Sequence, residues 1–147
     1  MADFWGLMRQ AKRTQHELAQ LLRMAEEITE STDRTALTEQ EKRVYGYAVQ
    51  LQDHANSLKA LTDFALAADS AEGYLYRQEN GRYCVDNNPD HELTSGTMLQ
   101  YRDDETGIFY TSRLEYGDGD YYIVDLGKGC PLASVFVIVK NSSFMYR

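Results

Sequence analysis

The chain has 147 residues, of which 43% are hydrophobic and 26% are charged, and its formal net charge is −8. This composition is typical of a folded globular protein and differs from the weakly hydrophobic, highly charged composition of disordered chains. The acidic balance holds on both sides of residue 72, with eight basic and eleven acidic side chains before it and seven and twelve from it on, which argues against a general binder of nucleic-acid backbones.

The first predicted element is a helix over residues 4–28. Apolar side chains repeat there at seven-residue spacing, which is the pattern of a helix that packs along a seam. One row is Phe4, Ala11, Leu18 and Ala25, the other is Leu7, Thr14, Leu21 and Ile28, and Met8 and Leu22 widen the stripe. Residues 31–37 are rich in side chains that favour turns, so we expect a loop there.

A second helix is predicted from Thr38, because Thr38 and Glu41 have the spacing of a capping box. Its apolar stripe is Val44, Leu51, Leu58 and Ala65, with Tyr47, His54 and Leu61 in a companion row and Ala48 and Ala55 beside them. The short connection predicts an antiparallel hairpin. A two-helix hairpin is marginal alone, so we expect neighbouring structure to bury its stripe, including Leu18, Leu21, Leu51 and Leu58.

From Gly73 on, apolar residues recur at every second position, which is the spacing of a β-strand. We therefore predict a helical hairpin at residues 1–70 and a small β domain at residues 71–147. Asn80 and Gly81 predict a type I′ turn between the first two strands. The strands are expected at residues 74–76, 83–85, 98–102, 108–115, 121–126 and 135–140. The predicted fold class is therefore α+β, with an antiparallel meander or SH3-like barrel after the hairpin.

Location follows from what the sequence lacks. No segment approaches the roughly 18 consecutive apolar residues of a membrane span, and the N-terminus has no secretion signal pattern. Two cysteines, Cys84 and Cys130, are too few for a disulfide framework and fit a reducing compartment. We therefore expect a cytoplasmic protein.

Five segments of the C-terminal half carry a family resemblance: Gly73-Tyr-Leu75, Asn80-Gly-Arg-Tyr83, Glu92-Leu-Thr-Ser-Gly96, Thr111-Ser-Arg-Leu-Glu115 and Tyr121-Tyr-Ile-Val124. Through them, residues 73–140 resemble a family of uncharacterised small β domains associated with conjugative elements and prophages of Gram-positive gut bacteria. The five apolar residues 135–139 depart from the family, whose strand usually alternates with basic residues, and burial on both faces or an interface would account for them. The resemblance implies a small β domain of mobile-element origin and implies no activity.

Catalytic chemistry has little support in the sequence. The three histidines, His16, His54 and His91, offer few general acid or base groups, and no phosphate loop, nucleophile elbow or zinc-protease pattern is present. A zinc site could be assembled from Cys84, His91 and Cys130, but their spacing matches no known ligand pattern. We predict a non-catalytic protein with no cofactor and no metal.

Tyrosines and acidic turns are the unusual feature of the β half. Tyrosine suits both half-buried strands and protein interfaces, so packing and binding stay equally open at this point. If the acidic turns lie at one end of the sheet, they form a negative patch with aromatic anchors. The predicted partner-binding residues are Asp103, Asp104, Glu105, Asp118, Asp120, Tyr101, Tyr110, Tyr116 and Tyr121.

Two functions are compatible with these features. The leading hypothesis is a mobile-element inhibitor that binds a basic surface of a host defence nuclease, as anti-CRISPR proteins do, because an acidic surface can take the place of nucleic-acid phosphates. The alternative is a nucleic-acid or conjugation accessory module that stacks bases on tyrosines. Its phosphate contacts would be Arg77, Arg82, Arg102 and Arg113. A homo-oligomer joined through the hairpin is compatible with either.

Overall fold

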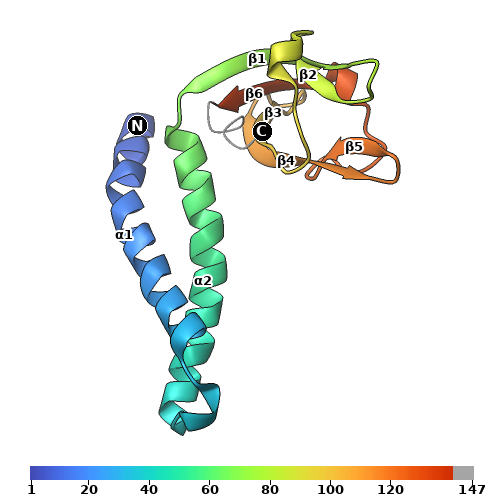
Figure 1. The fold of residues 1–147 in the computed structure, drawn as a ribbon. Helices are drawn as coiled ribbons and strands as arrows, with labels where there is room; N and C mark the ends of the chain where they lie inside the picture. Colours follow the sequence, from blue (N-terminus) through green and yellow to red (C-terminus); the bar gives the residue numbers. More distant parts are fainter. Residues whose placement is uncertain (141–147) are drawn as a thin grey trace. The chain divides into compact units, whose positions relative to one another are not determined.

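A helical hairpin precedes a curled antiparallel sheet in the computed structural model, which describes residues 1–140 (Figure 1). The hairpin consists of α1 (Phe4–Ser31) and α2 (Glu39–Leu66). The sheet consists of β1 (Asp69–Arg77), β2 (Tyr83–Val85), β3 (Met98–Arg102), β4 (Phe109–Gly117), β5 (Asp120–Ile123) and β6 (Phe136–Lys140). The α+β class expected from the sequence is therefore confirmed. The chain divides into two compact units, the second of which begins at Ala67.

Side-chain caps set the starts of both helices. The Asp3 carboxylate accepts a hydrogen bond from the Gly6 N–H at 2.8 Å ahead of α1. At α2 the expected capping box is present: the Glu41 N–H donates to the Thr38 hydroxyl at 3.1 Å, and the Thr38 N–H donates to the Glu41 carboxylate at 3.0 Å. These hydrogen bonds favour the charged form of Glu41 and lower the pKa of its carboxyl.

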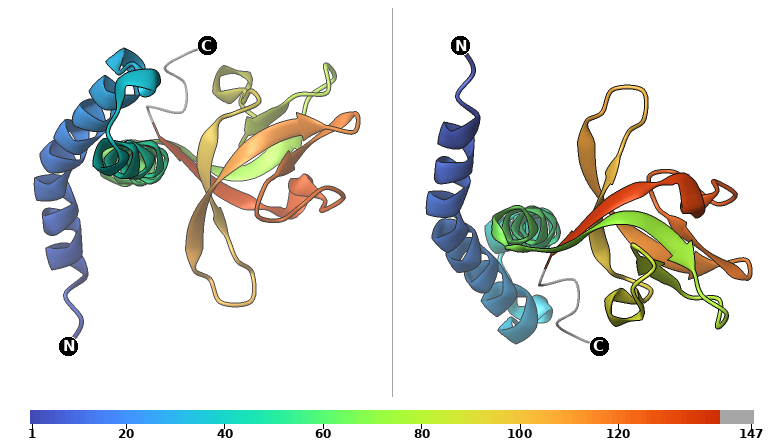
Figure 2. Two further views of the ribbon diagram at one scale, coloured as in Figure 1. Left: turned by 90° about the horizontal axis from the view of Figure 1, so that it is seen from below. Right: turned by 90° about the horizontal axis from the view of Figure 1, so that it is seen from above.

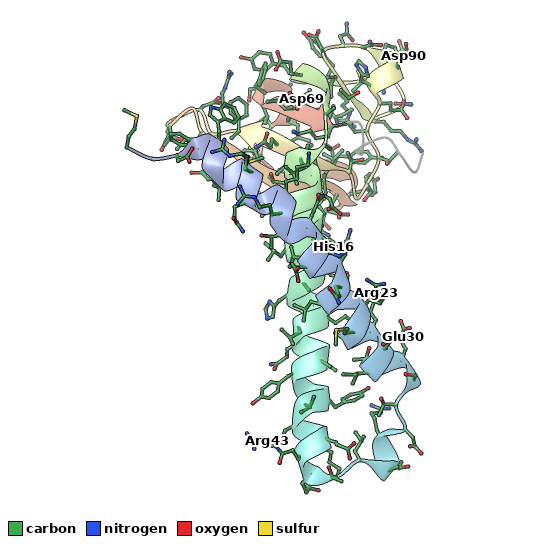
Figure 3. The ribbon with its side chains drawn as sticks, turned by 90° about the vertical axis from the view of Figure 1, so that its left-hand side faces the viewer. His16, Arg23, Glu30, Arg43, Asp69 and Asp90 are labelled. Atoms are coloured by element: carbon green, nitrogen blue, oxygen red, sulfur yellow. The ribbon has the colours of Figure 1, made fainter. Side chains whose placement is uncertain are left out.

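The two helices pack through a narrower seam than the sequence predicts. The buried side chains along the seam are Leu18, Leu22 and Ala25 of α1 and Ala48, Ala55 and Thr62 of α2. Hydrogen bonds from Gln15 to Asp63 at 2.7 Å and from Thr29 to Gln52 at 2.8 Å join the helices. The charged side chains labelled on the helices in Figure 3, such as Arg23 and Arg43, lie on exposed positions.

The prediction that the stripe of large side chains lies in this seam is wrong for α2. Val44, Leu51 and Leu58 remain 49%, 44% and 48% exposed, and Leu21 of α1 is also exposed. The parallel row Ala48, Ala55 and Thr62 has the same seven-residue spacing, and its small side chains allow close approach of the helices. The large side chains therefore lie on the flank of the pair.

The strand order of the curled sheet departs from the chain order. The order is β2-β1-β6-β3-β4-β5, with every neighbouring pair antiparallel. Because β6 lies between β1 and β3, the sheet is not a simple meander, and it curls into a half-barrel (Figure 2). Its core includes Leu75, Val85, Leu93, Leu99, Leu114, Ile123, Leu132, Val137 and Val139.

The apolar run at β6 is explained by its central position. Val137 and Val139 are fully buried in the core. On the other face, the Phe136 ring packs edge-on against Tyr74 at 5.4 Å and against Phe109 at 6.3 Å between ring centroids. Both faces of this strand are thus covered by other side chains, which accounts for the absence of an alternating pattern.

Two local predictions in the β unit need correction. Gly73 lies within β1, where its backbone approaches Asp86 so closely that an added Cβ would be 2.8 Å from the Asp86 Cβ, so the strand begins before the predicted boundary. The β1–β2 turn is not type I′, because Gly81 has a positive φ and Asn80 does not. Its closing bond runs from the Gly81 N–H to the Gln78 carbonyl at 2.9 Å.

Candidate functional site

The half-barrel brings its two edge strands together without pairing them. β2 and β5 are at opposite ends of the strand order. Nevertheless the Tyr83 ring of β2 packs edge-on against the Tyr121 ring of β5 at 6.3 Å. The Arg77 guanidinium of β1 lies 3.5 Å from the Asp120 carboxylate of β5. The edges of the sheet therefore meet through side chains, and a cleft lies beside this contact.

This cleft, which we call the tyrosine cleft, has a volume of about 310 Å³. It is lined by Tyr83, Gly117, Asp118, Asp120, Tyr121, Tyr122, Lys128, Gly129, Cys130, Pro131 and Leu132. Aromatic and aliphatic walls with a few charged groups at the rim are typical of sites that bind organic groups.

The turn between β4 and β5 shapes one side of the cleft. Asp118 and Gly119 both have positive φ, at 55° and 85°, and Gly117 pairs with Asp120. These features indicate a type I′ hairpin turn, for which Asp-Gly is a preferred sequence. The tight turn holds the end of β4 against β5, so that the Tyr116 and Tyr121 rings pack at 5.0 Å between centroids. Tyr116 is 57% exposed beside the cleft.

Charged groups at the rim are paired within the domain. The Lys128 ammonium lies 3.0 Å from the Asp118 carboxylate and 5.5 Å from the centre of the Tyr122 ring. The hydrogen bond that the Lys128 ammonium donates to the Asp118 carboxylate raises the pKa of Lys128 above its usual value. Burial and, to a smaller extent, the Asp120 carboxylate raise the pKa of the Tyr83 hydroxyl, which stays protonated at neutral pH.

The two acidic turns do not form the single patch that was expected. The Asp103–Gly107 turn precedes β4 and the Asp118–Gly119 turn follows it, so the nine residues of β4 separate them. At about 3.3 Å per residue, that strand spans roughly 26 Å. Figure 2 shows the two hairpin ends pointing in different directions. The hypothesis of one negative patch is therefore wrong, because consecutive hairpins place their turns at opposite ends of the shared strand.

At the β3–β4 end, the predicted residues differ in accessibility. Tyr101 is only 9% exposed and belongs to the core, where its hydroxyl donates to Asp125 at 3.3 Å. Tyr110 is exposed. The Asp103 carboxylate accepts from the Glu105 N–H at 2.8 Å and so stabilises the turn itself. Asp104, together with the neighbouring Glu105, presents exposed negative charge at this end.

The four arginines of the nucleic-acid alternative all lie beside carboxylates. The pairs are Arg77 with Asp120 at 3.5 Å, Arg82 with Glu92 at 3.0 Å, Arg102 with Asp104 at 3.9 Å and Arg113 with Glu115 at 3.8 Å. Each pair is neutral overall, so these arginines offer phosphates little net attraction.

The cysteines occupy different environments. Cys84 is fully buried, and burial, with a smaller effect from Glu92, raises the pKa of its thiol. Cys130 lines the tyrosine cleft. Within residues 1–140, no group of three or more histidine, cysteine or acidic side chains is close enough to hold a metal ion. In the same range, neither helix is long and apolar enough to cross a membrane.

No family model matches this chain, and neither the curated proteins nor the solved structures include a match. The site must therefore be interpreted from its own geometry. Asp118, Asp120 and Tyr121 of the cleft are among the residues predicted from the sequence, whereas the residues of the opposite walls are not. Those walls come from Tyr83 of β2 and from the segment 128–132, which only the folded sheet brings to β5. The Asp118-Gly119 dipeptide was the available local signal for the hairpin at its centre.

Proposed function

We propose that this chain is a non-catalytic protein-binding factor and that its tyrosine cleft is the recognition surface of the β domain. The observation that carries the proposal is the exposed Tyr116 ring, held against Tyr121 beside an open cleft between β2 and β5, which do not pair with each other. Tyrosine provides large amphipathic contact area at a low cost in conformational entropy, and such residues are common energetic centres of interfaces.

The proposed partner has a basic surface. The β3–β4 turn has three acidic residues, Asp103, Asp104 and Glu105, against the single neighbouring cation Arg102. Exposed charge of this kind mainly speeds the encounter of two proteins, whereas packed aromatic groups mainly slow their dissociation. The acidic turn and the tyrosine cleft would thus contribute to different steps of binding, even though they lie at opposite ends of β4.

The more specific proposal is an inhibitor from a mobile element that covers the nucleic-acid channel of a host defence nuclease. The net charge of −8 supports a basic target surface. The mobile-element origin is a hypothesis that rests on the resemblance noted in the sequence of residues 73–140. The four arginines that could contact phosphates each lie beside a carboxylate. This pairing favours the inhibitor proposal over direct nucleic-acid binding.

The experiment begins with the partner recovered from a lysate of the native host and measures its binding kinetics to purified variants. Tyr116→Ala should increase the dissociation rate by about tenfold or more, since interface aromatics commonly contribute over 1.4 kcal/mol. Tyr76→Ala is the matched control, because Tyr76 is exposed on β1 but does not line the cleft.

A second pair of variants tests the acidic turn. Asp104→Lys with Glu105→Lys should slow association and weaken its salt dependence. Glu27→Lys with Glu30→Lys changes the net charge equally but lies on α1, and it should have a much smaller effect. Tight, salt-sensitive binding of the wild-type chain to free duplex DNA, with no protein partner recovered, would refute the proposed function.

A further inference from the structure

The hairpin exposes an apolar stripe along one flank of α2. Val44, Leu51 and Leu58 form one row at seven-residue spacing, and Tyr47 and Leu61 lie in the companion row with His54 between them. All five apolar side chains are between 44% and 55% exposed. This is the spacing of a coiled-coil seam, and α2 thus has a second such seam beside the one it uses to pack on α1.

Exposed apolar residues of α1 lie on the same side. At 100° per residue, Leu21 is displaced by 60° from the buried Leu18, and Leu51 is displaced by 60° in the same sense from the buried Ala48. Because the helices are antiparallel, equal displacements of this kind point to one side of the hairpin. Leu21 and Met24 therefore extend the α2 stripe into a single face, which we call the hairpin face.

Charge indicates what can cover the hairpin face. The chain carries a net charge of −8, so two copies repel each other except where carboxylates are absent. The α2 stripe has no acidic residue from Val44 to Leu61 in either row, whereas the remaining surface of α2 includes Glu39, Asp53 and Asp63. On α1, the exposed Glu17 lies on the same face between Leu21 and Met24 around the helix. The face is therefore mostly apolar and has few carboxylates, so a second copy can cover it with little charge repulsion.

The size of the face is sufficient for a specific dimer. From Val44 to Leu61 the hairpin face is about 26 Å long. Two helices about 10 Å apart present a face about 20 Å wide, hence roughly 500 Å² per copy, so a dimer would bury about 1,000 Å² in total, which is at the lower bound for a specific interface.

From the heptad spacing, the absence of carboxylates from the α2 stripe and the area, we infer that the hairpin face binds the same face of a second copy, so that two hairpins form an antiparallel four-helix bundle. A two-fold axis makes every contact reciprocal, with the α2 stripes of both copies at the centre. Each dimer then presents two tyrosine clefts. This inference is independent of the proposed function, since it uses no residue of the β unit.

Sedimentation equilibrium of the full chain over a range of concentrations tests the inference. The wild type should have twice the mass of the monomer, and dilution should shift it toward the monomer. Leu51→Glu with Leu58→Glu should raise the dimer dissociation constant by at least about 100-fold, because each buried charge occurs twice in the symmetric interface. Helical circular dichroism of the monomeric variant should be retained.

The matched control is Val49→Glu, at an exposed position of α2 on the opposite flank, which should leave the dimer intact. The milder variant Leu58→Ala keeps the test valid if the double substitution prevents folding, and it should weaken the dimer without adding charge. A wild type that remains monomeric at 100-fold dilution and at the highest soluble concentration alike would overturn the inference. So would equal effects of substitutions at Leu58 and at Val49.

Discussion

Truncation of Leu114 is the most direct test of how the half-barrel is held together. Leu114 is fully buried in β4, where it pairs with Ile123 of β5. Its backbone is fixed on both sides, because its N–H donates to Thr97 at 2.9 Å and its carbonyl accepts from Gly96 at 2.7 Å. The sheet can therefore not collapse into the space left by Leu114→Ala, and the free energy of unfolding should fall by about 3–5 kcal/mol.

Urea unfolding followed by near-ultraviolet circular dichroism measures this loss, since tyrosine signals report on the packed β unit. The control is Val124→Ala, because Val124 follows β5 and is exposed, and its cost should stay below about 1 kcal/mol. If the free energy of unfolding fell by equally small amounts in the two variants, with its dependence on urea concentration unchanged, the core would not centre on β4.

Further predictions concern the cysteines and one carboxylate. In the native chain a thiol reagent should rapidly modify one cysteine, Cys130. Cys84 should react only after unfolding, because it is buried and its thiol pKa is raised. Rapid reaction of both thiols, or loss of the rapid reaction in Cys84→Ser rather than in Cys130→Ser, would contradict this. The pKa of Glu92 should lie below its ordinary value of 4.5, because Gln78, Arg82 and Asn80 donate hydrogen bonds to its carboxylate. The contribution of Glu92 to stability is then present above its unfolded pKa and is lost as the pH falls through its folded pKa, so Glu92→Gln should flatten the decline in stability below pH 4.5. Carboxyl titration followed by NMR measures the folded pKa. A folded pKa above 4.5 would contradict the assignment.

The hairpin shows which features sequence periodicity can predict. The sequence pattern predicted two antiparallel helices and the capping box at Thr38, because these features depend on residues close in the chain. It could not decide which row of α2 packs on α1. The rows that begin at Val44 and Ala48 both repeat every seven residues. The row that begins at Ala48 packs on α1, because its small side chains let the two helices approach closely. Large side chains favour burial, but their position in a hairpin depends on the partner that is present.

The β unit shows a different limit. Positions of the strands follow from alternation and turn residues, and β3 was predicted with its observed bounds. The tyrosine cleft depends on the strand order, in which β6 is central and the edges β2 and β5 approach each other. Nothing in the local sequence links Tyr83 to Tyr121. Separation of the acidic turns, by contrast, could have been predicted, since two successive hairpins that share β4 must turn at its opposite ends.

Recognition through the tyrosine cleft is the central claim, and site-specific photo-crosslinking tests it most directly. A photoreactive phenylalanine analogue placed at position 116 is beside the cleft, whereas the same group at position 76 lies on an exposed part of β1 that does not line it. With the recovered partner protein at saturating concentration, position 116 should give a covalent adduct and position 76 should give at most a trace. Equal adducts from both positions, or an adduct from position 76 alone, would contradict the claim.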